Sequence, residues 1–136
     1  MKFLKMAVPL ILAATTMPAS AHHSFAMFDK SKVVTISGSL YAVEWKNPHG
    51  WFWIKVQTPD GRVQTWGLEG ASPGVFAREG VKKSDFIIGE KVKVDLHPLR
   101  NNQTGGQFLR LTFRNGKQVG KLTGIGDEFR KKGYIR

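Results

Sequence analysis

The sequence predicts an all-β protein, a five-stranded OB-like Greek-key barrel with one short helix between its third and fourth strands. Three observations support this prediction. Segments of alternating apolar and polar residues recur along the chain, turns rich in Gly, Pro and Asn separate them, and a helix-start signal follows the third segment. An open β-sandwich of the same strands is the alternative, because periodicity alone does not distinguish the two.

The first strand is expected between residues 33 and 45, where the sequence reads VVTISGSLYAVEW. Apolar residues fall on both parities of this segment, and Gly38 near its middle indicates a bend or a bulge. We therefore expect one long strand that serves two parts of a curled sheet, as in a barrel.

The second and third strands are expected to form a hairpin. The turn NPHG at residues 47–50 precedes WFWIKVQ, and the tight turn TPDG leads on to RVQTWGLEG. The second strand alternates between an inward set, Phe52, Ile54 and Val56, and an outward set, Trp51, Trp53, Lys55 and Gln57.

The helix is expected to begin after Ser72, which can act as its N-cap before Pro73, and to end near Gly80. Two strands follow, GEKVKVDLHP and QFLRLTFRNGK, and the polar loop NNQTGG separates them. The residues expected to point inward are Val92, Val94 and Leu96 in the first and Leu109, Leu111 and Phe113 in the second.

The first 21 residues have the layout of a secretory signal peptide, with a basic head, an apolar run too short to cross a membrane, and small residues before a cut after Ala21. The remainder divides into an N-terminal arm (22–32), the barrel domain (33–119) and a basic C-terminal tail (120–136). We expect a periplasmic protein with no membrane span in the mature chain.

Composition restricts the chemistry of any site. The formal net charge of +11 predicts attraction to anionic surfaces, lipids or polymers. The chain has no cysteine, so a metal site must use histidines, carboxylates and main-chain groups. It contains no phosphate loop, dinucleotide fingerprint, zinc-helix motif or nucleophile elbow, and we assign no catalytic residue.

The two histidines after the predicted cut suggest a copper site. Cleavage after Ala21 would give His22 a free α-amine, which with its ring Nδ1 can chelate one metal ion. A third nitrogen from another imidazole completes the T-shaped arrangement called a histidine brace, which suits Cu(II). The ordinary pKa values of these groups, about 7.7 for an α-amine and about 6.5 for an imidazole, impose little proton competition at neutral pH.

The sequence offers several candidates for the other ligands. His23 offers a rival local chelate, through the amine, the intervening amide nitrogen and its own ring. OB-folds bind ligands beside the loops after strands one and four; His49 lies in the first of these loops and His97 just before the second. His49 is the better third ligand, with Glu44 and Glu69 as carboxylate or supporting partners. The alternatives are a turn role for His49 and a solvated strand face for His97.

Trp51 and Trp53 are candidate ligand-binding residues, because they lie on the face opposite the core residues of their strand. Aromatic residues interspersed with basic ones resemble a surface for single-stranded nucleic acid, but export argues against that partner. A glycan or a small anionic or aromatic ligand fits as well, and the alternative is that the tryptophans pack under the arm and the tail. The basic residues concerned are Lys55, Lys91, Lys93, Arg110 and Arg114.

Four segments, HHSFAMFD, VEWKNPHGW, WGLEGASPGVFAREG and LHPLRNNQTGG, resemble a family of small exported bacterial proteins known only as a domain of unknown function, 6152. The resemblance covers nearly all of the mature chain and implies a periplasmic β-barrel protein without an established activity. The positions that match the family pattern are His22, His23, Asp29, Asn47, Pro48, His49, Trp66 and Glu69. Separately, the N-terminal His22 is similar to that of lytic polysaccharide monooxygenases and periplasmic copper carriers.

These observations leave three hypotheses. The first is a periplasmic copper-binding protein for copper handling or sensing, with His22, His23 and His49 as metal ligands. The second is a metal-free binding module of the OB type for an anionic or aromatic ligand. The third is an oxidative copper enzyme, which needs an open coordination position and a substrate surface that Trp51 and Trp53 could supply.

Overall fold

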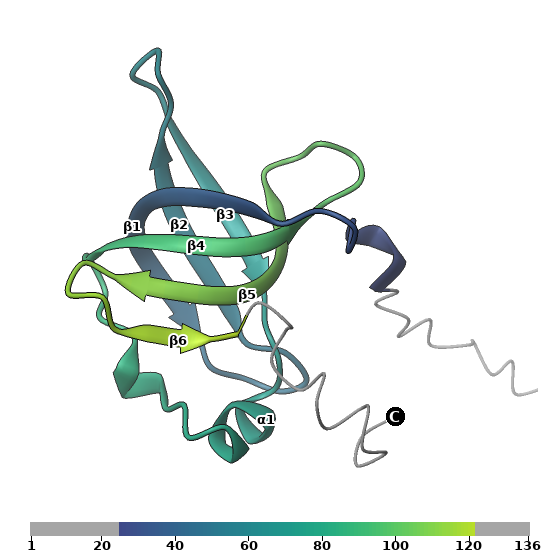
Figure 1. Ribbon diagram of the computed structural model, residues 1–136, viewed down its shortest axis with the longest axis vertical. Helices are drawn as coiled ribbons and strands as arrows, with labels where there is room; N and C mark the ends of the chain where they lie inside the picture. Colours follow the sequence, from purple (N-terminus) through teal and green to yellow (C-terminus); the bar gives the residue numbers. More distant parts are fainter. Residues whose placement is uncertain (1–24, 122–136) are drawn as a thin grey trace, which may run out of the picture.

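The computed structural model describes residues 25–121 of the chain (Figure 1). Strands dominate this part, with one short α-helix and two 3-10 turns. In chain order the elements are η1 (Phe25–Met27), β1 (Val34–Glu44), β2 (Trp51–Gln57), β3 (Val63–Glu69), α1 (Pro73–Arg78), η2 (Lys83–Asp85), β4 (Lys91–Pro98), β5 (Gly105–Phe113) and β6 (Gln118–Gly120).

The first five strands form a closed barrel, which confirms the predicted fold class. β1 pairs antiparallel with both β2 and β4, β3 pairs with β2, and β5 pairs with β4. A short parallel pairing of Gly67–Glu69 in β3 with Gly105–Gln107 in β5 closes the ring. Figure 1 shows β1 curling across the barrel to join its two neighbours.

A bulge explains why β1 carries apolar residues on both parities. Its register against β2 shifts between Leu40 and Ala42, so Tyr41 is the extra residue and is exposed. Before the bulge Ile36 and Leu40 point into the core, and after it Val43 packs against the core. The sharing of one strand by two parts of the sheet is as predicted, although the register shift lies three residues beyond Gly38.

The helix begins where its cap signal predicts. The Val75 N–H donates to the Ser72 hydroxyl oxygen at 3.3 Å, and Pro73 is the first helical residue. α1 lies below the barrel in Figure 1, and its Phe76 is completely buried. The Phe76 ring lies among four aromatic neighbours, Trp45, Phe52, Phe86 and Phe108.

Two features at the end of the barrel differ from the sequence expectation. The register of β5 against β4 shifts at Leu109, so Phe108, which was not in the expected inward set, is also buried. The expected inward residues Leu109, Leu111 and Phe113 are all buried. In addition, the unpredicted strand β6 pairs with Arg110–Thr112 of β5.

The segment before β1 is bound to the loop between β4 and β5. Phe28 forms a bridge with Leu99, the Asp29 N–H donates to the Pro98 carbonyl oxygen at 2.8 Å, and the Arg100 N–H donates to the Met27 carbonyl oxygen at 2.9 Å. This fixes where the N-terminal arm meets the barrel. Within residues 25–121, no helix has both the length and the apolar character needed to cross a membrane.

Candidate functional site

A row of polar and aromatic residues crosses the outer surface of the barrel. Strand register places its members opposite one another on five neighbouring strands. The row consists of Glu44 on β1, Trp51 on β2, Glu69 on β3, Gln107 on β5 and His97 on β4. The loops after β1 and after β4 flank this row, which is the arrangement expected of an OB-type binding face.

His49 is held beside this row by a link between two loops. The Gly50 N–H donates to the Ala71 carbonyl oxygen at 2.9 Å, and the Gly70 N–H donates to the Gly50 carbonyl oxygen at 2.8 Å. His49 Nδ1 donates to the Gly70 carbonyl oxygen at 3.2 Å. Because a carbonyl oxygen only accepts hydrogen bonds, Nδ1 carries the proton, and Nε2 is the ring nitrogen that can serve as a metal ligand.

That nitrogen faces a buried carboxylate. Nε2 of His49 lies 3.5 Å from Oε1 of Glu69, whose side chain is only 5% exposed. Nε2 and the Glu69 carboxylate both carry lone pairs that a metal ion between them could accept, and its charge would compensate the cost of burying the carboxylate.

Trp51 and Trp53 form a stacked pair, with ring centroids 5.9 Å apart and an angle of 20° between the rings. The Trp53 indole N–H donates to Glu44 Oε1 at 3.2 Å, and Glu44 also forms an ion pair with Lys46. Hydrogen bonds from Lys46 and then from Trp53 lower the pKa of the Glu44 carboxyl. Gly67 leaves room for the Trp53 ring, since a Cβ there would come within 2.7 Å of it. The pair is therefore fixed in place.

The basic residues lie apart from this aromatic pair. In the strand register Trp51 lies between Glu44 and Glu69, whereas Lys91, Lys93 and Arg114 line a groove over β1, β4 and β5. Lys55 lies over the exposed Tyr41 ring, 3.9 Å from its centroid. Arg110 binds the Asp95 carboxylate through two nitrogens at 2.8 and 2.9 Å.

His97 occupies the far end of the row from Glu44. Its Nδ1 donates to the Lys32 carbonyl oxygen at 2.6 Å. Gln107 separates His97 from Glu69, so the two backbones are about 10 Å apart at the usual spacing of neighbouring strands. His49 and Glu69 are brought together, whereas His97 is held by the segment that precedes β1.

Two of the three predicted metal ligands, His22 and His23, lie outside the described residues. Between residues 25 and 121, no group of three or more His, Asp or Glu side chains is arranged to hold a metal ion. A site at His49 and Glu69 thus needs ligands from elsewhere. Of the other tryptophans, Trp45 packs against Phe76 and Phe86, and Trp66 packs against the core.

Comparison with known proteins identifies the family of the chain. Residues 10–108 match a family of unknown function (DUF6152). The chain belongs to this family. No curated protein and no solved structure matches the chain.

The DUF6152 segment covers every member of the outer row, together with His49. It also covers one row residue that sequence reasoning missed, Gln107, which lies between Glu69 and His97. Strict alternation of inward and outward residues in β5 would turn both Leu109 and Gln107 inward. The bulge at Leu109 shifts this alternation by one residue, so Phe108 points inward and Gln107 outward. The groove residue Arg114 and the strand β6 follow the DUF6152 segment.

Proposed function

We propose that this protein is a periplasmic copper-binding protein that uses a mature N-terminal histidine, in copper handling or sensing. The His22 amine and ring supply two nitrogens, Nε2 of His49 supplies the third, and Glu69 supports the site as a ligand or a charge partner. The observation that carries the proposal is the 3.5 Å approach of His49 Nε2 to the buried Glu69 carboxylate.

The spacing of these two atoms is suitable for a shared metal ion. Bonds from a first-row metal to imidazole nitrogen or carboxylate oxygen are about 2.0–2.2 Å long, so two such ligands at 90–110° lie roughly 3.0–3.5 Å apart. Copper forms the strongest complexes with nitrogen ligands among the divalent first-row metals.

The N-terminal arm is long enough to reach this position. Three backbone contacts connect the arm to β3. Phe28 pairs with Leu99, the Leu99 N–H donates to the Gly105 carbonyl oxygen, and Gly105 pairs with Gly67 of β3. Three steps of about 5 Å between neighbouring chains, and about 7 Å along β3 to Glu69 at right angles to them, correspond to a straight-line distance of roughly 17 Å. The three residues of η1 span about 6 Å, and residues 22–24 add about 10 Å when extended, so the arm covers a similar distance.

Copper titration monitored by EPR tests the proposal, once intact mass has established that the exported chain begins at His22. Wild type should give a Cu(II) spectrum with three nitrogen ligands, which His22→Ala and His49→Ala each alter. Glu69→Gln should weaken copper binding about 10–100-fold while retaining the nitrogen set. His97→Ala is the matched control and should leave both spectrum and affinity unchanged.

Two outcomes would contradict this site. An unchanged spectrum in His49→Ala would assign copper to the local chelate of His22 and His23. Equal copper binding by wild type and by a chain with one extra residue before His22 would remove the copper hypothesis. The metal-free binding module would then lead, supported by the fixed Trp51–Trp53 pair and its carboxylate neighbours, which suit a sugar or an aromatic ligand.

A further inference from the structure

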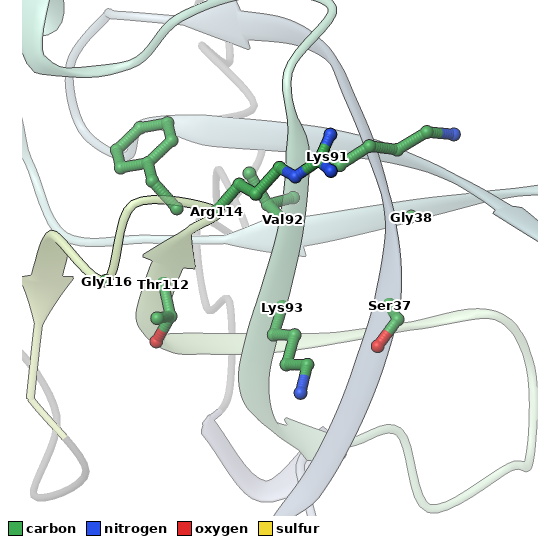
Figure 2. A pocket seen from close by; sticks show the side chains of 9 residues that line it. Ser37, Gly38, Lys91, Val92, Lys93, Thr112, Arg114 and Gly116 are labelled. Carbon is green, nitrogen blue, oxygen red and sulfur yellow. The ribbon is translucent and has the colours of Figure 1, made fainter.

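A basic groove crosses the outer surface of β1, β4 and β5, separate from the copper site proposed above. Its volume is about 430 Å³. Figure 2 shows Ser37, Lys93 and Thr112 on three neighbouring strands, with Lys91 and Arg114 toward the other end of the groove. Every charged side chain among the described residues that line it is a cation.

Strand register builds this surface from hydrogen-bond donors. Ser37 lies opposite Lys93, and Lys93 lies opposite Thr112, so a lysine is flanked by two residues that carry hydroxyl groups. Guanidinium, ammonium and hydroxyl groups together are the donors that bind phosphate oxygens. A second hollow, lined by Ser39 and Lys55, continues the groove. Ser39 of β1 lies opposite Lys55 of β2 on one side and opposite Lys91 of β4 on the other.

Among the described residues, the cations of the groove form no ion pair, in contrast to many basic residues elsewhere on the surface. Within residues 25–121, none of the ion pairs involves Lys91, Lys93 or Arg114, although seven other lysines and arginines form them. Those seven are Lys32, Lys46, Arg62, Arg100, Arg110, Lys117 and Lys121. The charge of the groove is thus available to an external anion.

Two consecutive apolar residues are exposed next to the groove. Ile87 and Ile88 are 57% and 56% exposed, just before β4 begins at Lys91. The segment that holds them is tied to the turn between β5 and β6, since Lys117 Nζ donates to Asp85 Oδ1 at 3.0 Å. That turn supplies Gly116 to the groove. The exposed isoleucines thus lie three and four positions before Lys91, in a segment tied to the turn that borders the groove.

We propose that this face docks the protein on an anionic phospholipid surface, with Lys91, Lys93 and Arg114 binding headgroup phosphates and Ile87 and Ile88 entering the interface. A soluble anion would not require the exposed isoleucines, whereas a lipid surface uses both features. Each basic residue near an anionic membrane contributes about fivefold to the partition constant. The formal net charge of +11 acts in the same direction.

Vesicle sedimentation tests the docking with the purified full-length mature protein. It should bind vesicles of phosphatidylcholine with phosphatidylglycerol, and bind vesicles of phosphatidylcholine alone much more weakly. The triple variant Lys91→Gln, Lys93→Gln, Arg114→Gln should bind anionic vesicles about 100-fold more weakly. Ile87→Ser with Ile88→Ser should weaken binding about tenfold or more. Circular dichroism verifies that each variant is folded.

The matched control removes the same charge from other parts of the surface. The triple variant Lys46→Gln, Arg62→Gln, Arg78→Gln should retain most of the binding, because distant exposed charges are screened by salt. Equal losses in the two triple variants would overturn the proposal. So would binding of inorganic phosphate in solution without vesicle binding, which would assign the groove to a soluble ligand. His49→Ala should bind vesicles like wild type, which separates this proposal from the copper site.

Discussion

At the scale of single residues, the Asp29 side chain stabilises the turn that leads from the N-terminal arm into β1. Its Oδ1 accepts hydrogen bonds from the Ser31 hydroxyl at 2.6 Å and from the Ser31 N–H at 3.2 Å. Lys32 Nζ lies 3.1 Å from Oδ2, and Arg100 lies further away at 3.8 Å. The Ser31 hydroxyl, and then Lys32, lower the pKa of the Asp29 carboxyl from 3.8 to about 2.

This pKa predicts an acid-sensitive contribution to stability. Because the folded-state pKa of Asp29 is depressed, its contribution is complete above about pH 4 and is lost as the pH falls toward 2. We expect Asp29→Asn to be less stable than wild type at neutral pH and to approach it in stability below about pH 2. Urea unfolding across this range measures the difference, and a constant gap at every pH would contradict the prediction.

Apart from Gln107, sequence reasoning named the residues of the candidate site but not the contacts between them. His49 and Glu69 were both singled out, yet they are 20 positions apart, and they meet only because Gly50 and Gly70 link the two loops. Such a link depends on strand register, which no short segment contains. The separation of the basic residues from the Trp51–Trp53 pair has the same origin.

At the scale of elements, Gly38 marks the closest approach of β1 to β2. A Cβ at this position would lie 2.2 Å from the Lys55 carbonyl oxygen, which as a backbone atom cannot move aside. Gly74 in α1 is the opposite case, since the nearest atom to its Cβ position is the Ser72 hydroxyl at 4.0 Å.

The two glycines predict opposite effects of the same substitution. Gly38→Ala should lower the free energy of unfolding by about 3 kcal/mol or more, because the added methyl group displaces backbone. Gly74→Ala should raise it by about 0.4–1 kcal/mol, because alanine reduces the freedom of the unfolded chain at a helical position. Urea denaturation of the two variants and wild type tests both, and equal effects would refute the argument.

Elements with local signals were predictable, and those set by distant contacts were not. The α1 helix follows from Ser72 and Pro73 alone, and β2 follows from its strict alternation. The bulges at Tyr41 and Leu109 could not be placed, because each bulge reverses the parity of a strand without a distinctive local sequence. β6 is only three residues long, and its pairing with β5 defines it.

At the scale of the whole molecule, one aromatic cluster joins the helix to the barrel. Phe52 and Phe108 are stacked with centroids 4.3 Å apart, and both contact Phe76 of α1. Phe86, which follows η2, contacts all three rings. The helix α1 is thus part of the core rather than a surface addition.

Phe76→Ala should therefore destabilise the entire protein. We expect the free energy of unfolding to fall by about 3–5 kcal/mol, the usual cost of removing a buried phenylalanine ring. Phe76→Leu, which retains most of the volume, should cost less than about 1.5 kcal/mol. Chemical denaturation with intrinsic fluorescence measures both. Loss of α1 alone, with an unchanged barrel transition, would show that the helix is not part of the cooperative unit.

The overall architecture was predictable because the order of strands and helix is specific to few folds. The closing contact between β3 and β5 was inferred only from that order, since its partners are almost 40 residues apart and pair over just three positions. Closure excludes the open sandwich that periodicity allowed.

Closure has a further consequence for how this molecule meets other chains. Each barrel strand is bonded on both edges over part of its length, and β5 is bonded to β3 near its start and to β6 near its end. The edges that remain open to an added strand are short stretches, such as residues 63–66 of β3, which pair with β2 but not with β5. The side chains of the outer surface offer a second means of recognition, and there the row and the basic groove lie at different positions along the strands that they share, β1, β4 and β5.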